Sequence, residues 1–256
     1  MQLNHLDLFS GIGGFTLAAR SLNINTKQFV ERDRHCQTVL QKHFPEIPIH
    51  DDARTFATRT GIFGIITAGY PCQDNSTANP KGKGLQGKRS GLLYEVFRIL
   101  EEAQPEIVVL ENVPPTQNRR WDETARRELE KRDFKAYRID LSAKDCGLWH
   151  LRNRCFLVGY ANRLRLNQTQ VLRRFSRQEV QAQIPKRRAD GVEFVRGHSS
   201  RVFAFPPPGI RRMVDGLPSE MDRFRLHALG NSVPPVMAET VLKVALFVPG
   251  GEWYAA

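Results

Sequence analysis

The sequence predicts an α/β fold: a mostly parallel β-sheet with helices on both faces, followed by a small basic segment. Through residues 1–160, apolar strand-like runs alternate with stretches of helical periodicity, which is typical of a parallel sheet with crossover helices. The run Glu106–Leu110 is apolar after its first residue, as expected for a strand buried on both faces. A glycine-rich turn, Ser10–Gly14, joins the first apolar run to a helix-like stretch.

The expected elements follow one another along the chain. Strands are expected at His5–Phe9, Gln28–Glu31, Gly61–Ala68, Glu106–Leu110 and Phe156–Val158. Helices are expected at Phe15–Ser21, Arg34–His43, Gly91–Ala103, Thr124–Arg132 and Val233–Phe247. Pro45 and Pro48 end the second helix, and Pro206–Pro208 marks a boundary before the last helix.

The composition indicates a soluble globular protein. Of its 256 residues, 41% are hydrophobic and 25% are charged, and no apolar run approaches the roughly 20 residues that span a bilayer. The first residues lack the features of a signal peptide, so a cytoplasmic location is expected. The cysteines Cys36, Cys72, Cys146 and Cys155 form no C-x-x-C pair, so neither a disulfide framework nor a structural metal site is expected.

Positive charge is concentrated in one part of the chain. The formal net charge is +11, and between Arg163 and Arg212 there are twelve Arg or Lys residues against three acids. A basic protein without a particular partner would also carry a positive charge. The concentration favours a polyanionic partner, because Lys and Arg displace condensed counterions from phosphates. The sequence therefore indicates that the chain binds nucleic acid.

Three turns with polar or glycine residues are expected at one edge of the sheet, after Phe9, Ala68 and Leu110. In such sheets, ligands bind beyond the carboxyl ends of the strands. At the first turn, glycines allow a close approach of backbone to ligand, and the following helix supplies free amides, which suits a nucleotide-like or carboxylate-bearing cofactor. Glu31, at the end of the second strand, is suited to accept hydrogen bonds from ribose hydroxyls. Alternatively, the turn is an ordinary tight turn and Glu31 is a solvated strand end.

Cys72 stands in a predicted loop, GYPCQ at residues 69–73, and not on an apolar face. Pro71 fixes the backbone before the thiol, and a loop thiol becomes a nucleophile where positive charge or amide dipoles stabilise the thiolate. The Gly- and Lys-rich stretch that follows is suited to closing over a substrate. The alternative is that Cys72 is a small structural residue and the stretch is a solvated loop.

Glu111 follows a fully apolar strand, so its carboxyl is expected to be partly desolvated and its pKa raised, which suits a group that holds or delivers a proton. Arg152 and Arg154 precede the last strand, and alternation puts their side chains on the same side. Two fixed guanidinium groups suit a carbonyl oxygen or a phosphate. The alternatives are a structural acid bound to loop amides and two surface arginines.

Together and in this order, these motifs resemble those of the DNA cytosine-C5 methyltransferases. The resemblance rests on DLFSGIGGF (residues 7–15), the acid at Glu31, HDDAR (50–54), GYPCQ (69–73), LENV (110–113), HLRNRCFLVG (150–159) and ALGNSVPP (228–235), spread across nearly the whole chain. The stretch PCQDNS, followed by a Gly/Lys loop and RSGLLYE, is most similar to small bacterial and phage members. The resemblance thus implies a protein encoded by a bacterium or phage.

The resemblance implies a Rossmann-like, S-adenosylmethionine-dependent methyltransferase fold and a chemistry. Cys72 would attack C6 of a flipped cytosine, Glu111 would support protonation at N3, and Arg152 and Arg154 would bind and polarise the base. Cofactor contacts are implied for Phe9, Ser10, Gly11, Gly13, Gly14, Glu31, Asp52, Pro71, Asn231 and Ser232, with Asp51 the alternative to Asp52 for the adenine amino group. DNA contacts are expected for Gln73, Ser76, Lys81, Lys83, Lys88, Arg89, Arg173, Arg174, Arg187 and Arg188.

The chain is expected to consist of a cofactor-binding and catalytic domain (residues 1–161), a short basic target-recognition segment (162–205) and a C-terminal part (206–256) that returns to the catalytic domain. The expected partner is double-stranded DNA, with a cognate restriction endonuclease as a candidate companion and the monomer as the expected state. Departures from the family pattern are His150, where Gln is usual, Asp74-Asn75, where Pro-Phe is commoner, and the shortness of the recognition segment. The alternatives are an RNA cytosine-C5 methyltransferase and a catalytically weak homologue that binds DNA.

Overall fold

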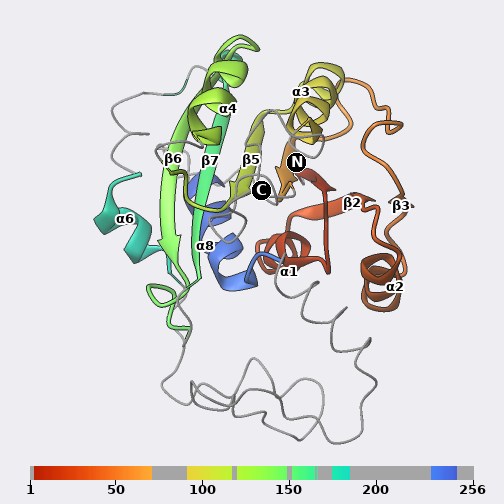
Figure 1. The fold of residues 1–256 in the computed structure, drawn as a ribbon, viewed down its shortest axis with the longest axis horizontal. Coiled ribbons are helices and arrows are strands. Elements are labelled where there is room, and N and C mark those ends of the chain that lie inside the picture. Colours follow the sequence, from red (N-terminus) through yellow and green to blue (C-terminus); the bar gives the residue numbers. More distant parts are fainter. Residues whose placement is uncertain are drawn as a thin grey trace, which may run out of the picture.

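A computed structural model describes residues 3–70, 91–116, 120–148, 152–164, 166, 175–184 and 232–246. In this part of the chain, strands form one seven-stranded sheet in the order β3-β2-β1-β4-β5-β7-β6. The strands are β1 (Asn4–Leu8), β2 (Asn25–Val30), β3 (Ile49–His50), β4 (Ile65–Ala68), β5 (Ile107–Asn112), β6 (Phe134–Ser142) and β7 (Asn153–Ala161). The first five strands are parallel, whereas β7 runs antiparallel to β5 and to β6 (Figure 1). The predicted mostly parallel α/β fold is confirmed.

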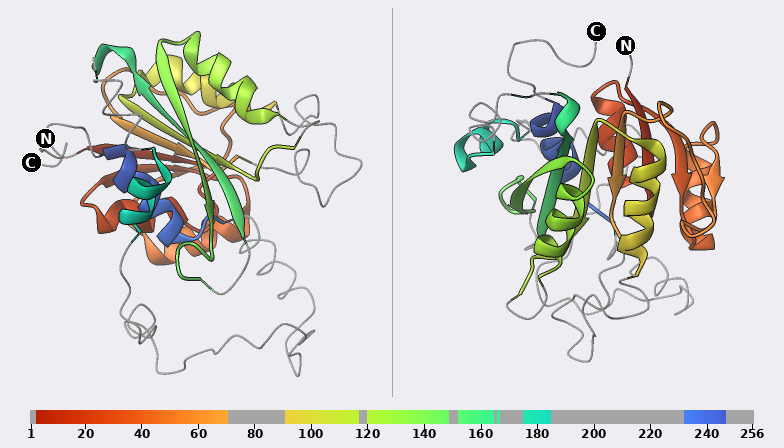
Figure 2. Two further views of the ribbon diagram at one scale, coloured as in Figure 1. Left: turned by 90° about the vertical axis from the view of Figure 1, so that its left-hand side faces the viewer. Right: turned by 90° about the horizontal axis from the view of Figure 1, so that it is seen from above.

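The helices lie on the two faces of this sheet. They are α1 (Gly14–Ser21), α2 (Arg34–His43), α3 (Leu92–Ala103), α4 (Trp121–Glu130), α6 (Arg177–Ala182) and α8 (Pro235–Leu246), with a short 3-10 helix, η2, at Asn162–Leu164. Helices α1, α2 and α8 cover one face, and α3 and α4 cover the other (Figures 1 and 2). None of the helices in the described ranges is long and apolar enough to cross a membrane.

The central strands supply both halves of the hydrophobic core. In β5, Ile107 and Val109 belong to the core beneath α1 and α8, whereas Val108 and Leu110 belong to the core beneath α3 and α4. All four side chains are buried, which matches the prediction of a strand covered on both faces. The alternating side-chain directions of a strand therefore set which helix each residue contacts.

Two strands were not predicted from the sequence, and β4 begins at Ile65, four residues after the expected start at Gly61. The long strand β6 was not predicted, although FKAYRIDLS alternates in burial, because its charged outward residues, such as Arg138, mask the apolar positions. The two-residue strand β3 is too short to give a periodic signal. Helix α4 also begins at Trp121, three residues before the expected start, and its first turn holds Asp122 and Glu123, which favour a helix N-terminus.

The C-terminal helix α8 packs against α1. Gly14 permits this approach, because a Cβ atom at this position would overlap the backbone carbonyl oxygen of Val233 and lie 3.2 Å from Ser232 Oγ. Tyr160, in β7, adds a second attachment by donating a hydrogen bond from its hydroxyl to the carbonyl oxygen of Ala245 at 2.9 Å. Residues 232–246 are thereby held against the first turn of α1, far away in the sequence.

We expect Gly14→Ala to destabilise the protein by about 1–3 kcal/mol, the usual cost of overpacking, because a backbone oxygen cannot move aside like a side-chain end. Helix propensity alone would favour Ala over Gly, so a loss of stability would be due to the overlap of the added methyl group with the Val233 carbonyl oxygen. Urea unfolding measures it. Gly64→Ala is the matched control, because its added methyl would meet only the side-chain ends of Leu3 and Glu106. A Gly14→Ala protein as stable as wild type would contradict this packing.

Candidate active site

The strand register aligns the predicted site residues in one row. Leu8 pairs with both Val30 and Ala68, and Ala68 pairs with Leu110. The residues that follow these strand positions are Glu31, Phe9, Gly69 and Glu111, in the order of the strands β2, β1, β4 and β5. The turns expected at one edge of the sheet therefore do meet there.

The glycine turn after β1 has an unusual backbone. Phe9, Gly11 and Gly13 all have positive φ angles, of 54°, 55° and 87°. Glycine adopts such angles without strain, whereas Phe9 must be held in place by its surroundings. Ser10 fixes the turn, since its hydroxyl donates to the carbonyl oxygen of Asp7 at 2.6 Å and its carbonyl oxygen accepts from the Gly13 amide at 2.9 Å. Helix α1 starts here, and its N-cap residue Gly13 has no side chain to cap it, although the Asp7 carboxyl binds the Thr16 amide in the first turn.

The carboxylate of Glu31 is held in a fixed orientation beside this turn. Its Oε2 atom accepts a hydrogen bond from the Gly11 amide at 2.7 Å, and its Oε1 atom accepts one from the Asp33 amide at 2.7 Å. Burial raises the pKa of Glu31, and the backbone hydrogen bonds from Asp33 and Gly11 oppose that rise. A carboxylate has about four lone-pair positions, and the amides of Asp33, Gly11 and Arg32 use up to three of them, so Glu31 can still accept from a hydroxyl donor such as that of a ribose.

The carboxyl group of Glu111 is buried at the end of β5. Its Oε1 atom forms an ion pair with Arg154 Nε at 2.6 Å, and the Glu111 side chain is only 6% exposed. Burial raises the pKa of Glu111, while the positive charges of Arg154 and Arg152 act to lower it. A Cβ atom at Gly69 would lie 3.3 Å from Glu111 Oε2 and 4.0 Å from the ring of Phe15, so the end of β4 lies between Glu111 and α1.

Helix α4 and β5 fix the path of the chain as it leaves β4. Asn112 Nδ2 donates to the carbonyl oxygen of Tyr70 at 3.4 Å, and the Asn112 Oδ1 atom accepts from the Val113 amide at 2.8 Å. The indole of Trp121 donates to the carbonyl oxygen of Val113 at 2.8 Å and meets the Tyr70 ring edge-on. Tyr70, two residues before Cys72, is therefore held next to the end of β5.

The antiparallel direction of β7 explains how the two arginines reach this edge. The first residues of β7 lie where the parallel strands end, since Asn112 pairs with Cys155. Arg154 contacts Glu111, and Arg152 Nη2 donates to the carbonyl oxygen of Ser232 at 2.6 Å. The predicted residues Glu111, Arg152, Arg154 and Ser232 are thus brought together.

The two acids expected at the adenine end line a polar pocket of about 500 Å³. Asp51 is exposed, whereas Asp52 already accepts hydrogen bonds from the Arg54 guanidinium, to Oδ1 from Nε at 3.0 Å and to Oδ2 from Nη2 at 2.6 Å. This hydrogen bonding by Arg54 lowers the pKa of Asp52 to about 2. The other lining residues are Arg32, Arg34, Gln37, Thr38 and Gln41. An amino group that binds Asp52 must share the carboxylate with Arg54.

Several predicted residues lie outside the described ranges. They are Pro71, Cys72, Gln73, Ser76, Lys81, Lys83, Lys88, Arg89, Arg173, Arg174, Arg187, Arg188 and Asn231. The other three cysteines, Cys36, Cys146 and Cys155, are buried.

A buried polar chain beneath the glycine turn was not expected from the sequence. Asp7 is 1% exposed, and its two oxygens accept hydrogen bonds from Thr16 at 2.8 Å and Thr67 at 3.0 Å. The ring of His5 lies 2.8 Å from Thr67 through Nε2 and 2.8 Å from Thr26 through Nδ1. The sequence did contain an indication of this chain: His5 and Asp7 stand at alternate positions of β1, so their side chains share the face opposite Leu6.

The sequence profile of the family described as "C-5 cytosine-specific DNA methylase" matches residues 3–197. The chain belongs to the C-5 cytosine-specific DNA methylase family. It is 32% identical over 165 residues to the Type II methyltransferase M.DsaV of Dactylococcopsis salina, covering 63% of this chain and 47% of that protein. It is 30% identical over 176 residues to M.HhaI of Haemophilus parahaemolyticus, covering 68% and 54%. The chain thus spans about half the length of these relatives.

The solved structure of the Entamoeba histolytica methyltransferase EhMeth has the same fold as this methylase-family chain. The TM-score is 0.64 at 17% identity, and the match covers 96% of this chain and 98% of that one. The seven-stranded sheet described above is therefore that of the methyltransferase fold, as predicted.

In this family member, Asp7 is expected to make stability depend on pH. Burial raises the pKa of Asp7 from 3.8 to about 7, against the effect of the Thr16 and Thr67 hydrogen bonds. Between these two values the folded protein keeps a proton that the unfolded chain releases, so the contribution of Asp7 to the free energy of unfolding falls as pH rises. The fall is at most on the order of 4 kcal/mol.

The measurement is urea unfolding of wild type and Asp7→Asn from pH 4 to pH 7.5. The substituted amide cannot ionise but has nearly the same shape as the carboxyl group, so the wild-type protein should lose stability relative to the variant across this range. Burial lowers the pKa of His5 to about 3, so His5 makes stability rise with pH in this window, but both proteins carry His5 and its contribution cancels in the difference. A stability difference that does not change with pH would show that Asp7 does not titrate in this window.

Proposed function

We propose that this chain transfers a methyl group from S-adenosylmethionine to C5 of a cytosine in double-stranded DNA. The observation that carries the proposal is the buried Glu111 carboxyl, paired with Arg154 and adjacent to Gly69, at the strand end that leads to Cys72. Membership of the methylase family and similarity to relatives named Type II methyltransferases support the reaction class. The recognised sequence, a companion endonuclease and the monomeric state remain predictions.

Cys72 is the proposed nucleophile. The other three cysteines are buried, and burial raises the pKa of Cys36 to about 12 and the pKa of Cys155 further still. A thiol with so high a pKa supplies almost no thiolate near neutral pH, and the thiolate is the reactive form. Position 72 follows Tyr70, which lies beside the end of β5, so the loop that carries Cys72 starts next to Glu111.

Glu111 is the proposed proton donor to the base. Because its pKa is raised, the carboxyl takes up a proton more readily than an exposed glutamate, and a proton given to cytosine N3 makes C6 electrophilic enough for attack by a thiolate. Arg154 keeps the Glu111 carboxyl in place, and the nearby Arg152 adds positive charge that suits the carbonyl oxygen of the base. Because C5 and C6 are stacked within a duplex, the base must be flipped out to be reached.

The residues at the cofactor end fit S-adenosylmethionine. The oriented carboxylate of Glu31 suits the ribose hydroxyls, and the positive N-terminal end of α1 suits the methionine carboxylate. The neighbouring pocket of about 500 Å³ falls in the range of roughly 300–1,000 Å³ that small ligands occupy. When bound, S-adenosylmethionine supplies an electrophilic methyl group on a sulfonium.

The proposed reaction passes through a covalent adduct between Cys72 and the base. The Cys72 thiolate forms a bond to C6 while N3 takes the proton of Glu111, and the electron-rich C5 then takes the methyl group, leaving S-adenosylhomocysteine. A water molecule takes the C5 proton, and the electrons of that C–H bond form the C5–C6 double bond as the bond between sulfur and C6 breaks and releases the thiolate. N3 then returns its proton to Glu111, which restores the starting state of the carboxyl. The basic residues between Arg163 and Arg212 are proposed to bind the phosphates of the duplex.

We expect Cys72→Ser to abolish methyl transfer while leaving S-adenosylmethionine binding nearly unchanged, because a serine hydroxyl is a far weaker nucleophile but has a similar size. Glu111→Gln should lower the rate about 10²–10⁴-fold, the usual contribution of a positioned proton donor. The full chain is expressed in a host without cytosine methylation, and 5-methylcytosine is mapped by bisulfite sequencing. Purified protein is tested with labelled cofactor on duplex DNA and on RNA.

Cys36→Ala is the matched control, since it removes a buried thiol that takes no part in the proposed reaction. It should keep its activity. Full activity in the Cys72→Ser protein would refute the nucleophile. Label in RNA and not in duplex DNA would favour the RNA methyltransferase, and cofactor and DNA binding without any transfer would identify a non-catalytic homologue.

A further inference from the structure

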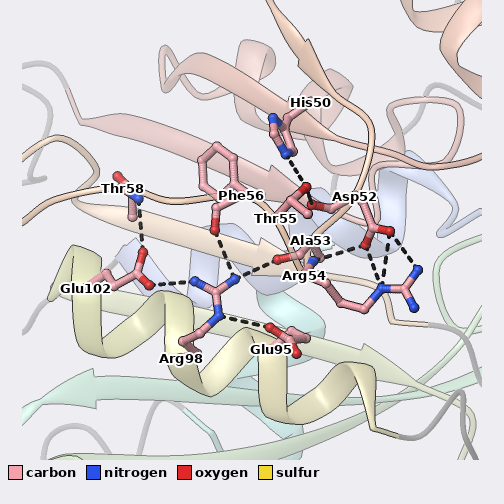
Figure 3. A network of polar contacts seen from close by, with 10 residues as sticks. All are labelled: His50, Asp52, Ala53, Arg54, Thr55, Phe56, Thr58, Glu95, Arg98 and Glu102. Atoms are coloured by element: carbon pink, nitrogen blue, oxygen red, sulfur yellow. Dashed lines mark hydrogen bonds and ion pairs between the residues drawn. The ribbon is translucent and has the colours of Figure 1, made fainter.

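Helix α3 binds the loop that carries Asp51 and Asp52, and Arg98 makes two of the contacts (Figure 3). Arg98 Nη2 donates to the carbonyl oxygen of Ala53 at 2.7 Å and to that of Phe56 at 2.9 Å. Both acceptors belong to the turn of residues 52–56, which is closed by a hydrogen bond of 3.0 Å from the Phe56 amide to the carbonyl oxygen of Asp52. Arg98 therefore binds two carbonyl oxygens of the turn that carries Asp52.

Two glutamates of α3 hold the Arg98 guanidinium in this position. Its Nε atom pairs with Glu95 at 2.9 Å and its Nη1 atom with Glu102 at 2.5 Å. Glu102 also accepts a hydrogen bond from the Thr58 amide at 3.0 Å, and its carbonyl oxygen accepts one from Thr60 Oγ1 at 3.1 Å. Helix α3 thus binds the loop at several successive residues, and four of the five donor positions of the guanidinium are used at fixed directions.

This attachment sets one wall of the polar pocket. Asp51 and Asp52 line the pocket from the loop, whereas Arg34, Gln37 and Thr38 line it from α2, on the opposite face of the sheet from α3. The buried side chains of Ala53 and Phe56 belong to the core beneath α3, so this core also attaches the loop to α3. A displacement of the loop relative to α3 therefore changes the distance between the two pocket walls.

We propose that Arg98 is a positioning residue for the cofactor: through the Ala53 and Phe56 carbonyl oxygens, it holds the pocket wall that receives the adenine of S-adenosylmethionine. The inference rests on the proposed function, because that function identifies the occupant of the pocket. Arg98 acts on binding through the loop and makes no contact with the reacting atoms. Its removal should weaken cofactor binding and leave the methyl transfer step largely unchanged.

The test is the affinity of the full chain for S-adenosylmethionine by isothermal titration calorimetry. Arg98→Met keeps most of the apolar stem but removes all the donors, and we expect the Kd to rise about tenfold, as for the loss of a hydrogen bond or two in a preformed site. Arg98→Lys keeps a positive charge and hydrogen-bond donors but lacks the planar guanidinium, so the Kd should rise less than in Arg98→Met. The Lys variant replaces the Met variant in the test if the Met variant does not fold. The KM for the cofactor should rise while kcat stays within about twofold of wild type.

Arg132→Met is the matched control. Arg132 also binds α3, through Glu101 at 2.7 Å and the Phe97 ring, and it joins α3 to the end of α4 at Glu128. These partners all lie outside the loop of residues 51–60, so the loss of Arg132 should reduce stability without changing the Kd. An equal rise of the Kd in both variants would mean general loosening of α3 and would overturn the proposal.

A second readout separates positioning from folding. If Arg98 acts by placing Asp52, the effects of Arg98→Met and Asp52→Asn on the Kd should not add, because either change alone removes the same contact. Additive effects, or wild-type affinity in the Arg98 variants, would overturn the inference and leave the proposed function intact. A wild-type protein that binds no S-adenosylmethionine would refute the proposed function itself, and this inference with it.

Discussion

The ion pair between Glu111 and Arg154 is the interaction on which the arrangement of the site depends. A carboxylate this deeply buried is costly unless a positive charge lies beside it, and removal of one partner would leave the other uncompensated. Arg154 can reach Glu111 because β7 runs antiparallel to β5, which puts its first residues at the carboxyl ends of the parallel strands. The reversal of one strand direction is therefore what adds two guanidinium groups to an otherwise ordinary parallel-sheet edge.

The same edge divides into two ends with different chemistry. On the β2 side, Glu31 offers an oriented carboxylate beside the glycine turn and the N-terminus of α1, which suit a polar cofactor. On the β5 side, Glu111 has a raised pKa and is flanked by cations, which suits an uncharged base that must gain a proton. The C-terminal segment joins the two ends, because Ser232 is bound by Arg152 and lies against Gly14. A methyl donor and a methyl acceptor would thus meet above β1 and β4.

Much of the fold and the row of site residues could be predicted from the sequence, because strand ends of a parallel sheet converge whatever the details of packing. Helix α2 was predicted with its observed bounds, since the N-cap Asp33 and Pro45 mark both ends locally. Strand β6 could not be predicted, because its pairing with β7 is a long-range contact and its exposed residues are charged. The role of Asp7 was also hidden: only the fold brings Thr16 and Thr67, distant in sequence, to its two oxygens. The hold of Arg98 on the Asp52 turn is likewise a contact between remote segments.

The most direct test of the central claim is covalent trapping on a duplex that carries 5-fluorocytosine at the target cytosine. Fluorine at C5 cannot leave as the proton does, so the adduct formed after methyl transfer should persist. Peptide mapping by mass spectrometry should find the modified base on Cys72, only when S-adenosylmethionine is present, and far more slowly in a Glu111→Gln protein. An adduct on another residue, or methylation of normal DNA by a protein that never forms the adduct, would contradict the account.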